Sequence, residues 1–251
     1  MRRGSRLLLA TGVLGTAGVL ATGIAGLPRF GHVPHPYGVR AVGAGLGRHT
    51  SNIVASLTFD QRGFDTAGEE FIMFAAAVSA VMLLRRMRDE DESHASHHYG
   101  SEDVFGALRV SGAAYLPVTL LVGCYIILHG QVTPGGGFQG GVVLATGFHL
   151  AYLAGDYRVL EKLRPLPVLD AAEAFAAIGF LLVGLAGLVA AGSFLANWLP
   201  LGQLRTITSA GTVPILNAFV GIEVGAATVL LLSRFLDQAL LVRRPDESSG
   251  G

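Results

Sequence analysis

The chain has 251 residues, of which 51% are apolar and 14% are charged, and its formal net charge is zero. Soluble domains usually carry nearer a quarter charged residues, so this composition favours a membrane protein over one or two soluble domains. The neutral net charge indicates no polyanionic partner such as a nucleic acid. The single cysteine, Cys124, excludes a disulfide within the chain and a cysteine-based metal cluster.

Six apolar segments have the length, or nearly the length, of a transmembrane helix. A span needs about 20 mostly apolar residues, because a helical residue rises about 1.5 Å and the apolar core of a membrane is about 30 Å thick. Lipid offers the backbone no hydrogen-bond partners, so such segments must be helical. We therefore expect an all-α, polytopic membrane protein with about six transmembrane helices, at about residues 7–27, 69–84, 112–129, 139–155, 171–192 and 214–236.

The first of these segments also has features of a signal peptide. It follows a short basic N-terminus and ends in small residues, as cleaved signals do. Its apolar run is longer than a typical signal core, so we favour a retained first helix.

The basic residues predict the orientation of the spans. With a cytoplasmic N-terminus, six spans place thirteen of the 18 lysines and arginines inside and five outside. Cytoplasmic connections of membrane proteins carry such an excess. We therefore expect both termini in the cytoplasm and the connection between the third and fourth spans on the outer side. A polar linker, residues 89–104, separates two spans from a block of four, and residues 243–251 form a tail.

Six glycines gather in LHGQVTPGGGFQGGVV, residues 128–143. A phosphate-binding loop needs a lysine and a hydroxyl residue directly after its glycines, and both are missing here. Glycines four residues apart instead let transmembrane helices approach closely, because lipid provides no hydrophobic drive between helices. Three pairs have this spacing: Gly136 with Gly140, Gly137 with Gly141, and Gly221 with Gly225. The stretch therefore predicts a tight turn that leads into a closely packed helix.

Ionisable side chains inside the spans are costly in lipid and are therefore candidates for function. His149 in the fourth span and Glu223 in the sixth both lie near the middle of the membrane, judged by their distance from the start of each span. A histidine and a carboxylate at similar depth can pass protons or hold a cation. The alternative is that each hydrogen-bonds a neighbouring helix and only fixes the packing. His129 belongs to the outer interface of the third span.

Two acidic positions have the spacing of a helix cap. Thr66 with Glu69, and Asp170 with Glu173, stand three residues apart, so that each glutamate can reach back to the amide of the capping residue. We therefore expect caps at the starts of the second and fifth spans. Glu70, next to Glu69, keeps a functional interpretation open.

Three histidines in the polar linker, His94, His97 and His98, have spacings that place them on one face of a helix. No further ligand is evident, and the composition is that of a solvated segment. We therefore expect no metal site, and no motif indicates a cofactor.

The glycine stretch resembles the signature of a known family. ILHGQVTPGGGFQGGVVLA is similar to the motif of the B subunit of multisubunit Na⁺/H⁺ antiporters, the Mrp or Mnh type, and of the related membrane subunit in energy-converting hydrogenases. The four spans in residues 105–242 look like that whole domain. The matching motif residues are His129, Pro134, Gly135, Gly136, Gly137, Phe138, Gln139, Gly140 and Gly141.

Residues 51–88 resemble the C-terminal segment of the large A subunit of the same antiporters, which is a separate small subunit in the hydrogenases. Most of the family pattern DFRGFDT-GE, a strand or loop before a helix, is present, with an added Gln61. Residues 1–50 precede this match. Glutamates in this region are candidates for the cation path of the family, which by position implies Glu69 or Glu70.

The resemblance implies a subunit of a cation/proton antiporter in the cell membrane rather than an enzyme. It implies other antiporter subunits as hetero-oligomeric partners, membrane lipid around the spans, and Na⁺ and H⁺ as the transported ions. Glu69 or Glu70, together with Glu223 and His149, would bind these ions while the partner subunits drive exchange. Two alternatives stay open, a purely structural subunit and a subunit of a hydrogenase-like proton-pumping complex.

Overall fold

The computed structural model describes residues 3–27, 36–84, 106–155 and 165–242, and within these ranges the chain forms helices and connecting turns without a strand. The chain divides into two compact units, residues 1–40 and 41–251. Helix α1 (Arg3–Ala25) belongs to the first unit and contains a short apolar stretch, Leu9–Ala25. The predicted linker with its three histidines and the predicted C-terminal tail lie outside the described residues.

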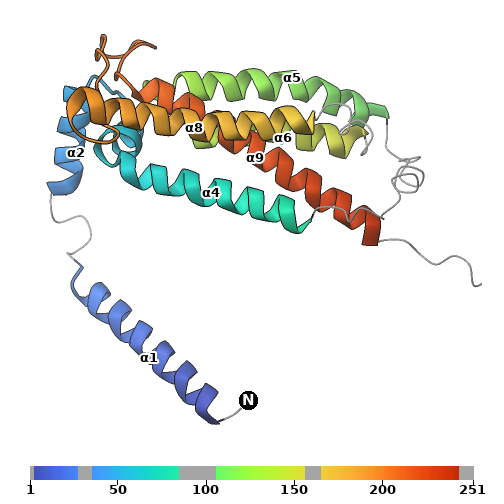
Figure 1. Ribbon diagram of the computed structural model, residues 1–251, viewed down its shortest axis with the longest axis horizontal. Coiled ribbons are helices and arrows are strands. Elements are labelled where there is room, and N and C mark those ends of the chain that lie inside the picture. The colour runs from blue at the N-terminus through green and yellow to red at the C-terminus, as the bar shows by residue number, and fades with distance from the viewer. Residues whose placement is uncertain (1–2, 28–35, 85–105, 156–164, 243–251) are drawn as a thin grey trace, which may run out of the picture. The chain divides into compact units, whose positions relative to one another are not determined.

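Five long helices form the body of the second unit (Figure 1). In chain order, α2 (Pro36–Gly47), α3 (Ile53–Ser56) and the π-helical turn η1 (Leu57–Gln61) come before them. The long helices are α4 (Gly63–Leu83), α5 (Gly106–Leu128), α6 (Gly137–Gly155), α8 (Leu166–Ala191) and α9 (Val213–Val242). Among the described helices, four contain segments long and apolar enough to cross a membrane: Gly63–Leu83, Val110–Leu128, Leu166–Ala191 and Val213–Leu236. The prediction of an all-α, polytopic membrane protein is confirmed, while the number of spans and the side of the termini stay predictions.

Each predicted span coincides with a helix, but several helices begin earlier than the apolar runs. Helix α4 starts at Gly63 and α8 at Leu166, because a helix continues through polar residues at the membrane boundary as long as its backbone bonds are made. Residues 36–47, expected in an external loop, form α2, and the start of the family pattern at Asp60 and Gln61, expected as a strand or loop, is helical in η1.

The π-helical turn explains how the added Gln61 fits. The Arg62 amide donates to the Leu57 carbonyl over 2.8 Å, which closes a turn one residue longer than an α-helical turn. The side-chain amide of Gln61 then donates to the Ala41 carbonyl and to the Ser56 hydroxyl. The extra residue is thus accommodated in η1 without disturbing the start of α4.

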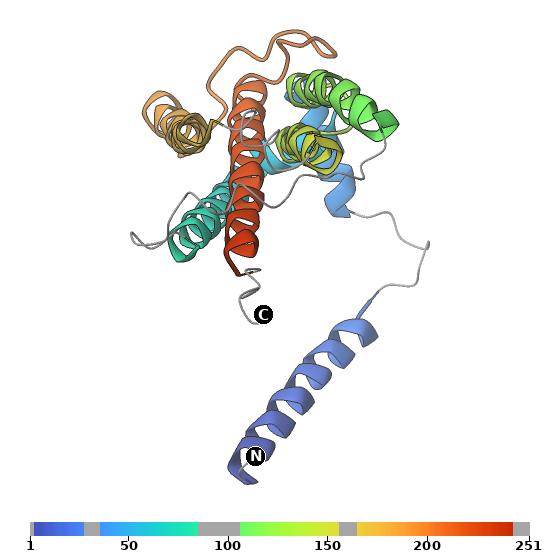
Figure 2. The same cartoon turned by 90° about the vertical axis from the view of Figure 1, so that its right-hand side faces the viewer.

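Helix α9 is the centre of the bundle. It contacts α4, α5, α6 and α8, and 61% of its span is buried, against 18 to 28% for the other three spans. Figure 2 shows α4 and α8 on one side of α9 and α5 and α6 on the other. The two sides of α9 therefore meet different neighbours.

Helix α6 fits between α5 and α9 because glycines line both of its contacts. A Cβ atom at Gly140 would lie 2.4 Å from Ile127 of α5, and one at Gly141 would lie 2.8 Å from the Gly221 carbonyl of α9. At Gly137 it would lie 2.6 Å from the Asn217 carbonyl. The predicted close packing is confirmed for the pair Gly137 and Gly141, and Gly140 faces the opposite neighbour.

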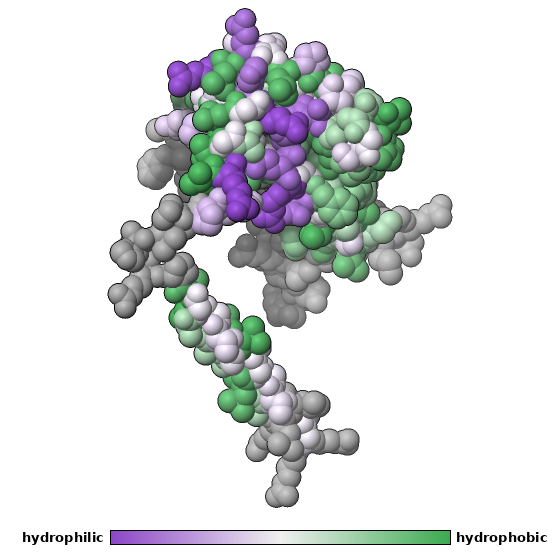
Figure 3. Space-filling view, turned by 90° about the vertical axis from the view of Figure 1, so that its left-hand side faces the viewer, coloured by the Kyte–Doolittle hydropathy of each residue, from purple (hydrophilic) through white to green (hydrophobic). Residues whose placement is uncertain are grey.

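One end of the bundle, here called the loop end, carries residues 41–62, 129–136 and 192–212. Figure 3 views this end, and hydrophilic side chains gather on it between hydrophobic ones. Arg48, Arg62 and Asp65, whose side chains are 49 to 62% exposed, come from its segments or the first turn of α4. This polarity agrees with a position at the membrane surface.

Asn52 joins the segment before α4 to the glycine turn. Its side-chain amide nitrogen lies 2.7, 2.9 and 3.1 Å from the carbonyl oxygens of Gly130, Thr133 and Gly135. Its side-chain oxygen caps α3 by accepting the Val54 amide. One asparagine therefore connects residues about 80 positions apart in the chain.

Candidate functional site

Two buried glutamates meet between α4 and α9. Glu70 of α4 is 3% exposed and Glu223 of α9 is fully buried. The two side chains come within hydrogen-bonding reach of each other. With both written as carboxylates, all four oxygens are acceptors and none has a donor among the described residues. A hydrogen bond between them therefore requires a proton on one of the two.

The local sequence sets where Glu70 points. The Thr66 hydroxyl, one turn earlier, donates to the Thr58 carbonyl over 2.6 Å and fixes the start of α4 against η1. Thr66, Ala67 and Glu70 are all buried, and these positions share one face of the helix. Glu69 is exposed on another face. Of the two glutamates implied by the resemblance, the structure places Glu70 inside the bundle.

Apolar residues lie within one helical turn of each glutamate. Ala67 on α4, Val220 and Val224 on α9 and Phe180 on α8 belong to one buried cluster. Glu70 lies about 10 Å along α4 from Gly63, inside a membrane core about 30 Å thick. Two carboxylate charges side by side in such surroundings repel each other and lose their hydration. The pair therefore needs a shared proton or a bound cation.

A third glutamate, Glu173 of α8, lies within electrostatic range of Glu223. It is 4% exposed, and its Oε1 atom is buried without a hydrogen-bond partner among the described residues. Asp170, one turn earlier on α8, is exposed and also within electrostatic range of Glu173. The interior between α4, α8 and α9 thus holds three buried carboxyl groups.

Both predicted helix caps are wrong. Helix α4 begins at Gly63 and α8 at Leu166, so Thr66 and Asp170 lie inside helices and have no free amides to cap. The spacing of three residues that suits a cap also equals one helical turn, and here it has that second meaning. The cap prediction therefore did not anticipate the burial of Glu173, although a glutamate followed by the apolar run to Ala191 is a visible signal.

His149 lies at a different level from the glutamate pair. Its side chain is half-buried on α6, with Nε2 lacking a partner among the described residues. Helices α6 and α9 run parallel, and Gly141 of α6 lies against Gly225 of α9. Eight residues further along each helix, His149 therefore lies at the level of Ser233. Ser233 is about 15 Å along α9 from Glu223. The structure does not bring His149 and Glu223 together.

The family-motif residues build the turn and not the carboxyl site. The His129 ring stacks on Tyr125 with centroids 4.1 Å apart, and its Nδ1 lies 3.0 Å from the Tyr125 carbonyl. Gln139 is exposed. The Gly137 amide donates to Asn217 of α9 over 2.8 Å, which ties the start of α6 to α9. Pro134, Gly135 and Gly136 complete the turn, and both glycines have the positive φ angles that other residues rarely adopt. Phe138 lies in the first turn of α6.

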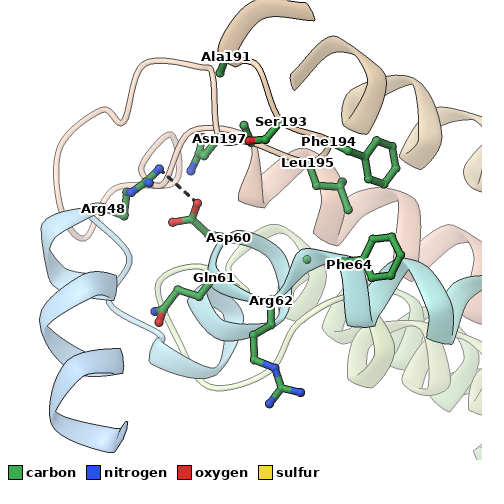
Figure 4. Close-up of a pocket in the computed structure, with 12 residues that line it drawn as sticks. Arg48, Asp60, Gln61, Arg62, Phe64, Ala191, Ser193, Phe194, Leu195 and Asn197 are labelled. Carbon is green, nitrogen blue, oxygen red and sulfur yellow. Dashed lines mark hydrogen bonds and ion pairs between the residues drawn. The ribbon is translucent and has the colours of Figure 1, made fainter. Parts of the chain in front are cut away.

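A pocket of about 430 Å³ opens at the loop end (Figure 4). Arg48 points at Asp60 there, with Nη1 and Oδ1 3.4 Å apart. Burial raises the pKa of Asp60, and the nearby Arg48 charge and the Asn197 side chain partly offset this rise. Leu195 lines the pocket and packs against Gly63 at the start of α4.

An apolar layer separates this pocket from the glutamates. Leu195 and Phe59 belong to the same buried cluster as Ala67 and Val220, which lie one turn before Glu70 and Glu223. Among the described residues, no group of three or more histidine, cysteine, aspartate or glutamate side chains is arranged to hold a metal ion. The interior therefore contains the Glu70–Glu223 pair, a third carboxyl group at Glu173, and apolar residues between the pair and the loop end.

These features define a class of protein: a multi-pass helical membrane protein whose central helix carries an ionisable residue into the bundle. Residues 107–230 match the family model of a domain related to the MnhB subunit of Na⁺/H⁺ antiporters, and residues 1–99 match the MbhE family model. The chain belongs to the MnhB-related family and carries an MbhE-type segment in front of that domain. The carboxyl pair joins the two parts, since Glu70 comes from the first and Glu223 from the second.

Two relatives are similar to the chain over about two thirds of its length or more. An uncharacterised protein of Methanocaldococcus jannaschii, MJ1307, is 31% identical over 209 residues, which cover 72% of this chain and 76% of that protein. The A/B subunit of a probable K⁺/H⁺ antiporter of Rhizobium meliloti is 32% identical over 187 residues, which cover 67% of this chain. The match covers 18% of the length of that second relative.

Two solved structures share the fold. A chain of the membrane-bound sulfane sulfur reductase, an archaeal respiratory membrane complex, has a TM-score of 0.70 and 28% identity, over 92% of this chain and 98% of that chain. A chain of the Mrp complex from Dietzia sp. has a TM-score of 0.67 and 24% identity, over 100% of this chain and 27% of that chain. The arrangement of helices around α9 therefore recurs in multisubunit membrane complexes.

Proposed function

We propose that this chain is a non-enzymatic membrane subunit of a multisubunit cation/proton antiporter, and that Glu70 and Glu223 form a site on its ion path. The observation that carries this proposal is the buried carboxyl pair, whose oxygens lack donors among the described residues. The similarity to an antiporter A/B subunit and to a chain of the Mrp complex supports the assembly with other subunits.

The chemistry of the pair suits exchange. Alkali cations bind oxygen ligands, and a proton competes for the same carboxylate oxygens. The repulsion between Glu70 and Glu223 is relieved by either ion, so binding of one favours release of the other. Glu69 lies on an exposed face of α4, away from the buried pair, and is not required for this step.

The choice of cation stays part of the proposal. The family model is named for Na⁺/H⁺ antiporters, and the Rhizobium meliloti relative is named for a probable K⁺/H⁺ antiporter. Both ions are alkali cations with oxygen coordination, so the carboxyl pair accommodates either in chemical terms. His149 is a weaker candidate for the same path, since it lies further along α6, at a different level from the carboxyl pair, and its Nε2 atom has no hydrogen-bond partner among the described residues.

Glutamine variants test the pair in the assembled complex. Glu70→Gln and Glu223→Gln keep the size of the side chain and remove its charge, so each is expected to lower cation/proton exchange in vesicles about tenfold or more. Glu69→Gln is the matched control, since it changes the neighbouring exposed glutamate on the same helix. Full exchange in both buried variants, with normal assembly, would mean that the subunit is purely structural.

A redox complex is the second candidate, because the sulfane sulfur reductase chain is similar over nearly its whole length. Purification of the native complex separates the two. Antiporter subunits among the partners support the proposal, whereas iron-sulfur subunits in their place contradict it.

A further inference from the structure

We propose that Glu173 and Asp170 on α8 form a proton branch that connects the Glu70–Glu223 pair to the end of the bundle opposite the loop end. This inference rests on the function proposed above and adds two residues to it. Neither residue belongs to the glycine motif or to the segment before α4, and the sequence pattern assigned both to a helix cap.

The direction of α8 places the branch. Gly179 of α8 lies against Phe219 near the start of α9, and Gly187 lies against Ala196 at the loop end. Helix α8 therefore runs antiparallel to α9, and its first turns lie away from the loop end. Glu173 is about 9 Å along α8 from Gly179, in the direction of its start. Among the described side chains, the next carboxyl group from Glu223 towards the opposite end is thus Glu173, and the one after it is Asp170.

Burial changes stepwise along this line. Glu223 is fully buried, Glu173 is 4% exposed, and Asp170 is exposed on the first turns of α8. Glu173 and Asp170 are three residues apart and share one face of the helix. Glu173 is within electrostatic range of Glu223 on one side and of Asp170 on the other. A single side chain therefore links the interior to the exposed helix end.

Among the described residues, neither a helix cap nor an ion pair accounts for Glu173. Helix α8 starts at Leu166, well before it, and shows no side-chain cap bond. Among the described residues, the two ion pairs are Arg48 with Asp60 and Arg62 with Asp65, and neither involves Glu173. The ionisable groups that act on this cluster are all acidic: Glu69 and Glu70 of α4, Glu223 of α9 and Asp170 of α8. A buried carboxyl group without a basic partner is costly in a membrane, which favours a functional reason for it.

Protons suit this branch better than cations. A cation needs several oxygen ligands at once, whereas a proton needs one oxygen at each step. Protonated Glu223 gives its proton through water to the Glu173 carboxylate and becomes a carboxylate that can bind a cation. Glu173 then passes the proton to the Asp170 carboxylate or to water at the helix end and returns to its charged form. Each transfer breaks one O–H bond and forms one.

The test compares three variants in the assembled complex, reconstituted in vesicles with Na⁺ or K⁺ and a trapped pH indicator. Glu173→Gln keeps the shape and hydrogen-bonding capacity but cannot carry a proton, so exchange is expected to fall about tenfold. Glu173→Asp keeps the carboxyl group and is expected to retain more exchange than Glu173→Gln. Asp170→Asn, at the exposed end where water can replace it, is expected to lower exchange about twofold to threefold.

A structural role predicts the reverse order, because glutamine is closer than aspartate to glutamate in size. Exchange in Glu173→Gln equal to or above that in Glu173→Asp would overturn the proton branch. Equilibrium binding of radioactive Na⁺ or Rb⁺ adds a second readout, since Glu173→Gln should leave it unchanged while Glu70→Gln lowers it. If Glu173→Gln does not assemble, unchanged exchange in Asp170→Asn overturns the branch and reduced exchange supports it.

The same data separate this inference from the proposed function. Loss of exchange in Glu70→Gln and Glu223→Gln, with wild-type exchange in the α8 variants, removes the branch and keeps the pair. Wild-type exchange in Glu70→Gln and Glu223→Gln removes the proposed function itself.

Discussion

The two sides of α9 differ in what they bury: one packs closely against glycines, and the other holds carboxyl groups. Towards α5 and α6, the helices are so close that a methyl group added at Gly137, Gly140 or Gly141 would collide with a neighbouring backbone or side chain. Towards α4 and α8, three carboxyl groups are buried with oxygens that lack partners among the described residues. The first side gains dispersion contacts and costs nothing in solvation, whereas the second is expensive and persists only if a bound ion or a task compensates. The buried carboxyl groups and the glycine-lined contact with α6 thus lie on different sides of one helix.

The largest expected effect comes from adding a methyl group to the glycine-lined contact between α6 and α9. Gly141→Ala places a Cβ atom 2.8 Å from the Gly221 carbonyl and from Val224, so α6 and α9 must separate. We expect a loss of about 1–3 kcal/mol in stability. Thermal unfolding of the purified protein in detergent measures this loss.

Gly225→Ala is the control for that variant, on the other side of the same contact. Its Cβ atom would lie 3.5 Å from the nearest atom, the Gly141 carbonyl, which is ordinary contact. Alanine also favours a helix over glycine, so this variant should be as stable as the wild type or more stable. Equal destabilisation by both substitutions would show that the glycines do not set the distance between the helices.

A smaller effect is expected where the two sides are joined. Asn52 holds the segment before α4 to the glycine turn through three carbonyl groups, and Asn52→Ser keeps a cap acceptor for α3 but loses these donors. We expect a loss of about 1–2 kcal/mol and easier proteolysis near α3. Ser51→Ala is the control, because the neighbouring Ser51 hydroxyl has no hydrogen-bond partner among the described residues. Wild-type stability of Asn52→Ser would mean that other contacts hold the two parts together.

Much of the fold followed from the sequence because lipid permits few solutions. Apolar length predicts a helix wherever water is absent, and each of the six predicted spans coincides with one. Helix starts were harder to predict, since polar residues such as Thr66 and Asp170 continue a helix at the membrane boundary. The π-helical turn and α2 gave no periodic apolar signal of sufficient length.

The candidate site was predictable residue by residue but not as a pair. Glu223 was identified by its place inside an apolar run, and Glu70 by resemblance together with Glu69. Their meeting depends on the order of helices around α9, which local patterns do not contain. Glu173 was assigned to a cap because a spacing of three residues fits both a cap and a helical turn. Only the position of the helix start distinguishes the two.

The smallest expected effect concerns Asp60, which lines the pocket at the loop end. Burial raises the pKa of Asp60 in the folded protein above its ordinary value near 3.8, although Arg48 and Asn197 oppose the rise. Between these two pKa values the folded state holds a proton that the unfolded state has lost, so stability falls as the pH rises through this window. Asp60→Asn cannot titrate and should lack this component.

The difference in melting temperature between wild type and Asp60→Asn, measured from about pH 4 to 7, isolates the contribution of this carboxyl group. Wild type should lose stability relative to the variant as the pH rises, and then stay level. The opposite slope would mean that the Arg48 charge outweighs burial and lowers the pKa, as in an ordinary surface ion pair. Asp60 would then be a charged part of the polar surface, and the cost of burying carboxyl groups would be confined to the interior between α4, α8 and α9.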